Sequence, residues 1–350
     1  MRIVVSTDGM GCRDECVVSA ADSHISAKHA DPFPPVETGL RRPLVPRVAV
    51  FLCTYQGQNY LAEQLDSICA QTHPNWLVVA SDDGSQDETL AILESYQHRL
   101  GADRLIVCSG PAEGYAANFL SLAHEASIGA DYYAYSDQDD TWKPDKLSRA
   151  LAWLETVPAN IPGLYCSRTL YISEHGRDVG LSTLFCKPPG FRNALVQSVA
   201  GGNTMVFNQA ARDLLAKTPK GIEIVAHDWW LYMLVTGCGG RVYYDPYPGV
   251  RYRQHGSNMA GQNVTFSARM VRVKELLAGR FKKWNEINVK ALGVLRDVLT
   301  EENRMVLDVF SHARKQPLVP RLVNLVRSGV YRQTLLGNVG LFVAAFFDKL

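Results

Sequence analysis

The stretch Val48–Tyr55 reads VAVFLCTY, an apolar run that closes on two residues with hydroxyl groups. A continuous apolar run of this length predicts a strand in the interior of a sheet. Apolar residues then recur at helical spacing at Leu61, Leu65 and Ile68, which predicts a helix directly after the strand. Residues 1–46 are rich in proline and show no clear periodicity, so we expect a poorly structured tail there.

The same pairing of a strand with a helix recurs after this first unit. Further strands are predicted at Leu77–Asp83, Leu105–Ser109 and Tyr132–Ser136. Ser85 with Glu88 forms a capping box that predicts a helix start, and residues 116–127 predict another helix. This alternation predicts the α/β fold class: a mostly parallel sheet with helices on both faces.

Polar residues gather where three of these strands end. The segments are Thr54–Gln56, Ser81–Ser85 and Ser136–Asp140. Ligands of open α/β sheets bind in the crevice beyond the carboxyl ends of the strands. We therefore expect the three segments to meet in one site although they are far apart in the sequence.

The third segment carries three carboxylates within four positions, Asp137, Asp139 and Asp140. Carboxylates held this close repel one another unless a cation lies between them. Hard divalent ions such as Mg²⁺ or Mn²⁺ use oxygen ligands of this kind and share them with nucleotide phosphates. The pattern favours a metal site, although a solvated acidic loop has the same composition.

Two other interpretations apply to this segment. Asp145 after Pro144 can begin a helix, so part of the acidic character can serve capping. An EF-hand counted from Asp137 requires glycine at its sixth position and an acid at its twelfth. These positions hold Trp142 and Ser148, which excludes that calcium loop.

The glycine-rich nucleotide signatures are absent from the sequence. The first strand is followed by no Gly-x-Gly-x-x-Gly, and no Gly-x-x-x-x-Gly-Lys-Ser/Thr occurs. These absences argue against a nicotinamide dehydrogenase and a P-loop enzyme. A sheet that presents carboxylates instead predicts a nucleotide diphosphate bound through a metal bridge.

Charge is distributed unevenly along the chain, whose formal net charge is +1. Residues 262–350 hold 15 Lys/Arg against 7 Asp/Glu, a net charge of +8, so the remainder carries 21 against 28, or −7. The basic region predicts an anionic surface partner, or else a solvated helical bundle. The apolar run Leu335–Phe347 is too short to span a bilayer and predicts a core or interfacial helix.

Composition also bears on the compartment. The chain has 350 residues, 47% of them hydrophobic and 20% charged, as expected of a globular protein with a sizeable core. Eight scattered cysteines predict free, buried thiols in a reducing compartment rather than disulfides. Residues 1–30 lack the apolar core of a secretory signal, so we expect a cytoplasmic protein.

The second half of the chain has a mixed pattern. Short strands are predicted at Leu164–Ile172, Thr204–Phe207, Arg241–Tyr244 and Val250–Arg253, with a helix around Asp228–Val235. We expect three regions: the tail 1–46, a catalytic domain 47–261 and a basic helical region 262–350. The catalytic domain divides into a nucleotide-binding half, 47–145, and an acceptor half, 146–261.

Five motifs in order resemble the family 2 glycosyltransferases, over roughly 210 residues from Arg47 to His255. They are VFLCTY (50–55), SDDGSQDET (81–89), SDQDDTWKPDKL (136–147), HDWWL (227–231) and YRQHGSN (252–258). The last resembles the rhamnosyltransferase-like branch in particular. This resemblance implies an inverting, metal-dependent enzyme with the nucleotide-diphospho-sugar transferase (GT-A) fold.

The resemblance assigns roles to residues of the first half. Asp83 would accept a hydrogen bond from the imide nitrogen of a uracil or thymine ring, with Thr54 and Tyr55 nearby. Asp137 would contact nucleotide and metal, and Asp139 would be the principal metal ligand. Asp140 would orient this loop or touch the sugar.

Residues of the second half complete the implied site. Asp228 matches the general base, a carboxylate that takes the acceptor's proton. His255 would complete the metal site and Arg253 would contact phosphate. Gly202 resembles a loop that an acceptor approaches, and Trp229 or its neighbour Trp230 would stack on a sugar, although a core position explains either tryptophan equally well.

The expected function is transfer of a sugar from a nucleotide donor to a growing glycan. The rhamnosyltransferase-like motifs imply dTDP-L-rhamnose as donor and a lipid-linked oligosaccharide of a bacterial surface polysaccharide, an O-antigen or exopolysaccharide, as acceptor. No nucleic acid is implied. The basic C-terminal region, with Arg321, Arg327 and Arg332, predicts peripheral attachment to the inner face of the cytoplasmic membrane. A sugar-phosphate nucleotidyltransferase and a non-catalytic sugar-nucleotide-binding module are the alternatives.

Overall fold

The computed structural model describes residues 45–255 and 279–350. The tail predicted for residues 1–46 falls almost wholly outside this part of the chain. So does the boundary predicted at residue 261, together with residues 256–258 of the fifth motif.

The four strands predicted in the first half are present and run parallel to one another. They are β1 (Val48–Thr54), β2 (Trp76–Asp82), β3 (Leu105–Ser109) and β4 (Tyr132–Ser136). Their order is β3-β2-β1-β4, so β1 lies between β2 and β4. All seven residues of β1 are buried, as expected of a strand in the interior of a parallel sheet.

Strand β1 divides the apolar interior between the two faces of the sheet. Val48, Val50 and Leu52 pack into one apolar cluster, and Ala49 and Phe51 pack into the other. This division follows from the two-residue period of a strand, which points successive side chains to opposite faces. Helices are therefore required on both sides of the sheet.

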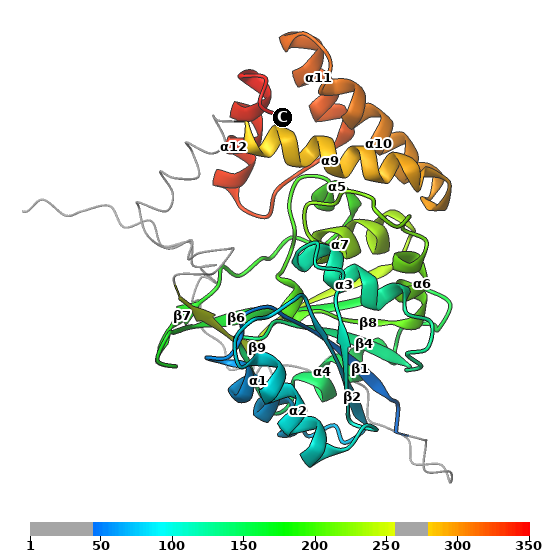
Figure 1. Ribbon diagram of the computed structural model, residues 1–350. Coiled ribbons are helices and arrows are strands. Elements are labelled where there is room, and N and C mark those ends of the chain that lie inside the picture. Colours follow the sequence, from blue (N-terminus) through cyan, green and yellow to red (C-terminus); the bar gives the residue numbers. More distant parts are fainter. Residues whose placement is uncertain (1–44, 256–278) are drawn as a thin grey trace, which may run out of the picture. The chain divides into compact units, whose positions relative to one another are not determined.

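The helices cover the sheet as the alternating pattern predicts (Figure 1). One face packs against α1 (Leu61–Cys69), α2 (Thr89–Leu100) and α4 (Lys146–Leu154). The other packs against α3 (Tyr115–His124), α5 (Phe191–Ala194), α6 (Gln209–Ala216) and α7 (His227–Gly237). Residues of the C-terminal helices join this second cluster.

The second half of the sheet is mixed in direction. Its strands are β5 (Thr141–Trp142), β6 (Gly163–Ser173), β7 (Asp178–Leu181), β8 (Val206–Asn208) and β9 (Arg241–Gln254). The sheet continues from β4 in the order β8-β6-β9-β5, and β7 pairs with β6. Strand β8 is antiparallel to both β4 and β6, whereas β6 and β9 are parallel.

Several local predictions differ from the structure: α3 ends at His124 rather than at residue 127, and β8 begins at Val206 rather than at Thr204. The capping box at Ser85 is wrong: α2 begins at Thr89, and the side chain of Asp87, not Ser85, accepts the Thr89 amide hydrogen at 3.0 Å. Strand β2 ends at Asp82, one residue earlier than predicted. The two strands predicted on either side of Pro246 form a single strand, β9.

Residues 279–350, the described part of the predicted C-terminal region, are helical as predicted. Its helices are α9 (Arg280–Val294), α10 (Glu301–Ala313), α11 (Leu318–Ser328) and α12 (Leu335–Phe346). Within the described parts of the chain, no helix has the length and apolar character needed to cross a membrane. The six cysteines of those parts are all free, although Cys108 and Cys186 are exposed rather than buried.

Candidate active site

The carboxyl ends of β1 and β2 are joined through Asp82, a residue to which the sequence analysis gave no role. Its buried carboxylate accepts hydrogen bonds from the Thr54 hydroxyl at 2.8 Å and from the Ser85 hydroxyl at 2.6 Å. The Ser85 amide also donates to it at 2.8 Å. Thr54 is itself 2% exposed, so it supports the site from beneath and does not present its side chain to a nucleotide.

Asp83 lies beyond the end of β2, in the loop that faces α3. Its two carboxylate oxygens accept the backbone N–H groups of Ala112 at 2.7 Å and Gly114 at 2.9 Å. A carboxylate has about four acceptor positions, so these bonds leave room for a ring N–H. Asp83 therefore fixes the loop before α3 and keeps acceptor capacity for a base.

Tyr55 and Gln138 connect the end of β1 to the acidic loop after β4. The Tyr55 amide donates to Gln138 Oε1 at 2.9 Å, and Gln138 Nε2 donates back to the Tyr55 carbonyl at 2.9 Å. The Tyr55 side chain is 58% exposed, as a stacking surface for a nucleotide ring would be. The central glutamine of the Asp-Gln-Asp motif thus places its neighbours Asp137 and Asp139 at the edge of the sheet.

Asp137 lies among other negatively charged side chains. Burial raises the pKa of its carboxyl, and the nearby charges of Asp139 and Asp228 raise it further, while Lys146 opposes the shift. The effect of Asp228 on Asp137 shows that the start of α7 lies near the acidic loop. A cation in this region would relieve the repulsion among the carboxylates.

Asp139 and His255 form the other part of the predicted metal site. Asp139 Oδ2 and His255 Nε2 are 2.7 Å apart, although 116 residues separate them in sequence. Among the described residues, no group of three or more His, Cys, Asp and Glu side chains is arranged to hold a metal, so Asp137 does not join this pair in a closed site. Mg²⁺ commonly takes only one or two protein carboxylates and completes its shell with phosphate and water oxygens. An open pair beside Asp137 fits that chemistry.

Asp140 is completely buried and does not reach the surface. Its carboxylate accepts hydrogen bonds from the Asn203 side chain and, at 3.1 Å, from the Arg253 amide. The predicted sugar contact is inconsistent with this burial. The contacts favour the other predicted role, in which Asp140 orients the loop.

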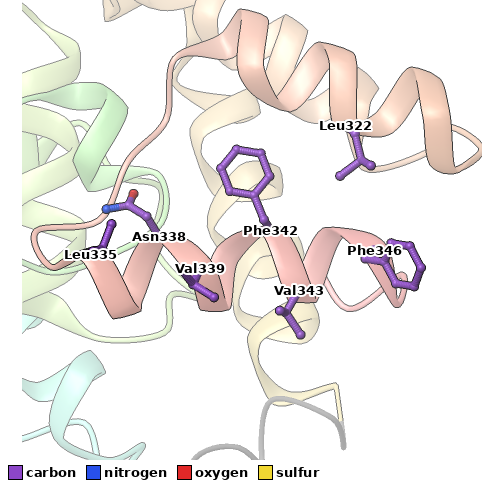
Figure 2. A pocket seen from close by; sticks show the side chains of 7 residues that line it. All are labelled: Leu322, Leu335, Asn338, Val339, Phe342, Val343 and Phe346. Carbon is purple, nitrogen blue, oxygen red and sulfur yellow. The ribbon is translucent and has the colours of Figure 1, made fainter. Parts of the chain in front are cut away.

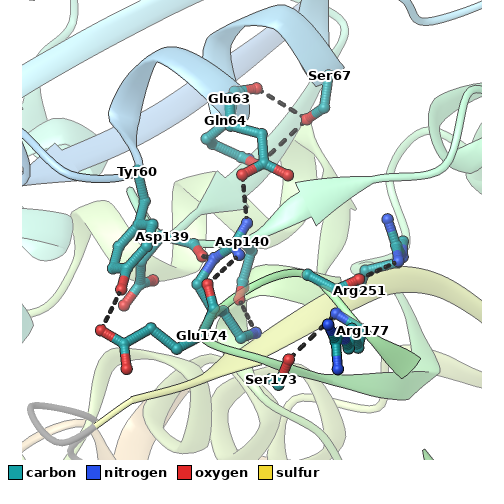
Figure 3. A network of polar contacts seen from close by, with 12 residues as sticks. Tyr60, Glu63, Gln64, Ser67, Asp139, Asp140, Ser173, Glu174, Arg177 and Arg251 are labelled. Atoms are coloured by element: carbon teal, nitrogen blue, oxygen red, sulfur yellow. Dashed lines mark hydrogen bonds and ion pairs between the residues drawn. The ribbon is translucent and has the colours of Figure 1, made fainter. Parts of the chain in front are cut away.

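Arg253 is also buried, with 2% of its side chain exposed, so the predicted phosphate contact is wrong for this conformation. Its guanidinium donates to Glu63 Oε2 at 2.5 Å and to the carbonyl oxygens of Asp139 at 3.0 Å and Glu174 at 2.9 Å. Figure 3 shows the polar network around Asp139 and Asp140, which includes Glu63 and Glu174. Arg253 holds the acidic loop against α1 and the β6–β7 turn.

Asp228 is the second residue of α7, where the backbone N–H groups of a helix start favour a negative charge. Its Oδ2 accepts the Gly202 amide hydrogen at 3.1 Å, and its Oδ1 accepts the Trp229 amide hydrogen at 2.6 Å. Burial nevertheless raises its pKa to about 6, with these hydrogen bonds opposing the shift. A carboxyl with this pKa is ionised at neutral pH and suited to accept a proton.

His227, next to Asp228, is a neutral buried imidazole. Burial lowers its pKa to about 3, and its ring stacks on Phe119 with a centroid separation of 3.9 Å. A Cβ placed on Gly202 would clash with His227 Nε2. There is therefore no room for a side chain at Gly202, which accounts for a glycine at this position.

The two tryptophans of the HDWWL motif belong to the core. Trp229 is 6% exposed and Trp230 is fully buried. The indole N–H of Trp229 donates to the Ala194 carbonyl at 2.6 Å, and that of Trp230 donates to the Thr218 hydroxyl at 3.0 Å. The predicted sugar stacking is wrong for both, and the alternative of a core position is the correct one.

Two further residues lie close to the acidic loop, one exposed and one buried, and neither was predicted to belong to the site. Tyr115, at the start of α3, is 41% exposed, and the pKa of its phenol is raised by burial and then by Asp228 and Asp137. Lys146 is buried beneath the acidic loop over the Trp142 ring, and burial lowers its pKa. Lys146 belongs to the motif SDQDDTWKPDKL, but the motif alone does not show that the Lys146 amine lies close to Asp137 and Asp140.

Comparisons with known proteins agree with this architecture. The family model described as Glycosyl transferase family 2 matches residues 49–207. The chain is 30% identical over 229 residues to the dTDP-rhamnosyl transferase RfbG of Shigella flexneri, covering 63% of this chain and 78% of that protein. It is 32% identical over 110 residues to an uncharacterized glycosyltransferase of Haemophilus influenzae, covering 31% of this chain and 33% of that protein.

A solved structure also shares the fold. The crystal structure of S. aureus TarS 1–349 in complex with UDP superposes with a TM-score of 0.50 at 16% identity, covering 87% of this chain and 88% of that chain. Identity this low bears on the fold alone. The motifs, the parallel half of the sheet and the match to most of the length of RfbG agree with one another. The chain belongs to the family 2 glycosyltransferases.

Proposed function

We propose that this glycosyltransferase is a metal-dependent inverting enzyme that transfers L-rhamnose from dTDP-L-rhamnose to a hydroxyl of a lipid-linked glycan. The product would be part of a bacterial surface polysaccharide, an O-antigen or exopolysaccharide. The observation that carries the proposal is Asp228, a carboxylate with a pKa of about 6, close enough to Asp137 to affect its ionisation. The general base Asp228 and the acidic loop therefore act on ligands bound in the same site.

Inversion follows from a single displacement at the sugar carbon. The acceptor hydroxyl attacks the face opposite the departing diphosphate, its oxygen forms the new bond, and its proton passes to Asp228. The Gly202 amide holds Oδ2 of that carboxylate at 3.1 Å, which leaves the group oriented when the acceptor arrives. The nucleotide diphosphate leaves with the electron pair of the broken bond.

The proposed nucleotide site lies between the ends of β1 and β2. Asp83 would accept the ring N–H of thymine, and the exposed Tyr55 ring would lie beside the base. The choice of dTDP-rhamnose is supported by the 30% identity to a dTDP-rhamnosyl transferase. Thr54 would support this site through its hydrogen bond to Asp82 rather than by direct contact with the nucleotide.

The proposed metal would be Mg²⁺ or Mn²⁺ held by Asp139 and His255, with Asp137 beside them. When bound, a divalent ion supplies positive charge that stabilises the leaving diphosphate. Carboxylate and water oxygens suit both Mg²⁺ and Mn²⁺. Asp139 and His255, 2.7 Å apart, would supply two ligands, and phosphate and water oxygens would fill the remaining coordination positions of the metal.

Thermal-shift screening of nucleotide sugars with and without Mn²⁺ would test the donor and the metal together. A ligand that binds only the folded protein raises the melting temperature according to its affinity. We expect dTDP-L-rhamnose with Mn²⁺ to give the largest increase. A larger increase with UDP-sugars would overturn the assigned nucleotide, and an increase unaffected by Mn²⁺ would overturn the metal.

Transfer itself requires a second measurement with a lipid-linked acceptor. We expect radiolabelled rhamnose to move to the lipid fraction with inverted anomeric configuration, which NMR of the product reports. Donor binding without transfer to any acceptor would favour a non-catalytic binding module. Formation of a nucleotide sugar from a nucleoside triphosphate and a sugar phosphate would favour a nucleotidyltransferase.

A further inference from the structure

Helix α12 is apolar on its outer side as well as on its inner side. Leu341, Ala344 and Ala345 are buried against the rest of the protein. Seven large apolar side chains of this segment are nevertheless exposed, from Leu335 at 82% to Val343 at 38%; the others are Leu336, Val339, Phe342, Phe346 and Phe347. Contiguous apolar surface of this kind marks a binding site for a protein or a membrane.

Five of these exposed side chains line an open groove of about 520 Å³, namely Leu335, Val339, Phe342, Val343 and Phe346 (Figure 2). Leu322 of α11 lines the groove with α12. Asn338 is the single polar residue of the lining, and its amide is already used: Oδ1 accepts the Arg332 amide hydrogen, and Nδ2 donates to the Thr334 carbonyl. The groove therefore presents no free polar group to an occupant.

Helix α11 extends the apolar surface. Val319, Val323 and Val326 are exposed by 44–69%. Together with Leu322 they occupy positions i, i+3, i+4 and i+7, which share one face of a helix. Because Leu322 faces the groove, the three valines lie on the same side of α11. Two neighbouring helices thus expose apolar side chains in the direction of one occupant.

The positive charge of this region favours an anionic occupant. Residues 314–350 contain six Lys/Arg and one Asp, a net charge of +5. Arg321 is paired with Asp348 at 2.7 Å and is largely buried, but Arg327 in the last turn of α11 is exposed. A second copy would bring another +5 to this face, and residues 256–278 carry +2 by composition, so both are poor electrostatic partners.

We propose that α11 and α12 form a docking surface for an anionic lipid bilayer, in which the exposed apolar residues enter the boundary between headgroups and acyl chains. At 12 residues α12 is about 18 Å long, too short to cross a bilayer, and so lies along its surface. Neighbouring cations such as Arg327 contact the headgroups. This inference goes beyond the sugar transfer proposed above and does not depend on the donor.

Vesicle flotation of the full-length protein tests the proposal. Phosphatidylcholine vesicles with and without phosphatidylglycerol are the probes. We expect binding to the anionic vesicles, weakened by added salt because surface charges are screened. Replacing Phe342 and Phe346 by serine should weaken binding at least about tenfold. Arg327→Gln should weaken binding to the anionic vesicles only.

The matched control replaces Val294 and Met305, which are equally exposed on α9 and α10, by serine. This control should bind vesicles as the wild type does, and both double variants should keep the wild-type melting temperature and donor-induced thermal shift. Equal loss in both double variants would overturn the proposal. So would absent vesicle binding, or a dimer in light scattering that the Phe342 and Phe346 changes dissociate, which would identify a second copy as the occupant.

Discussion

The Gly202 amide and the Asp228 carboxylate are joined by a hydrogen bond of 3.1 Å at the start of α7. The position that supplies this amide cannot hold a side chain, since a Cβ on it would clash with His227 Nε2 and lie 3.3 Å from Asp228 Cβ. His227 cannot easily move because its ring is stacked on Phe119. The orientation of the base thus depends on a glycine 26 residues earlier in the chain.

Gly202→Ala should therefore impair transfer more than donor binding. We expect a fall in kcat of ten- to a hundredfold and a loss of about 1–3 kcal/mol in stability, the usual range for overpacking. Gly129→Ala is the matched control, since a Cβ there meets nothing within 4 Å. In a His227→Ala background the cost of Gly202→Ala should shrink, and an undiminished cost in that double-mutant cycle would rule out the clash as its cause.

Asp228→Asn should abolish transfer and stabilise the protein. The amide cannot accept the acceptor's proton, so we expect a loss of at least about a thousandfold in kcat with donor affinity retained. Because burial raises the pKa of this carboxyl from 3.8 to about 6, its ionisation costs up to about 3 kcal/mol in the folded state. The gain in melting temperature should be present at pH 7, decline between pH 6 and 4, and vanish below. A lower melting temperature at pH 7 would contradict this account.

The pH profile of the wild type at saturating Mn²⁺ should have an acidic limb from Asp228. Mn²⁺ beside Asp137 would keep that carboxyl ionised, although burial raises its pKa to about 8. Asp228 accepts a proton only when ionised, so kcat/KM should fall as pH drops below about 6, with a limiting slope of one. His227 should add no second limb near neutrality, since burial holds its pKa near 3. Initial rates between pH 5 and 8 at saturating Mn²⁺ measure this, and a flat profile would exclude Asp228 as the base.

Removing the metal or its principal ligand should weaken donor binding. Chelation with EDTA, or Asp139→Ala, should lower donor affinity at least about tenfold and abolish the Mn²⁺-dependent part of the thermal shift. Asp178→Ala removes an exposed carboxylate that pairs with Arg251 and serves as the control. Unchanged Mn²⁺ dependence in the Asp139 variant would remove that residue from the metal site.

Arg253→Lys should be costly although it conserves charge. A lysine cannot replace the three directions in which the guanidinium reaches Glu63, Asp139 and Glu174, so we expect a loss of about 2–4 kcal/mol. Arg251→Lys, at an exposed ion pair two residues away, should cost no more than about 1 kcal/mol. Urea denaturation of both variants compares their free energies of unfolding, and similar losses would argue that the three contacts of Arg253 do not hold the acidic loop in place.

The parallel half of the fold was predictable because its signals are local. Val48–Thr54 is apolar throughout and buried on both faces, so neither its type nor its place in the sheet required distant information. Strand β9 was harder, because Pro246 and Pro248 suggest a break. The ladder with β6 has a gap between Asp245 and Val250, which is where a proline without an N–H can be accommodated.

The site was predictable in its residues more than in their roles. Asp137, Asp139, Asp83 and Asp228 all lie at the ends or starts of elements, as the pattern of strands and helices predicts. Whether a polar or aromatic side chain in such a motif faces a ligand depends on residues far away in sequence. Trp229 is buried against Ala194, and Asp140 is buried against Asn203. No local sequence pattern predicts these contacts.

The contacts of Arg253 also set an order of assembly. The acidic loop is fixed by bonds that span 113 and 114 residues, from Asp140 to the Arg253 amide and from its guanidinium to the Asp139 carbonyl. Such distant contacts form late, after the entropy of closing a long loop has been overcome. A growing chain can pair β1 to β4 before β9 is synthesised, but its acidic loop cannot yet have its final shape. The enzyme therefore gains its proposed metal-binding geometry only once nearly the whole catalytic region has left the ribosome.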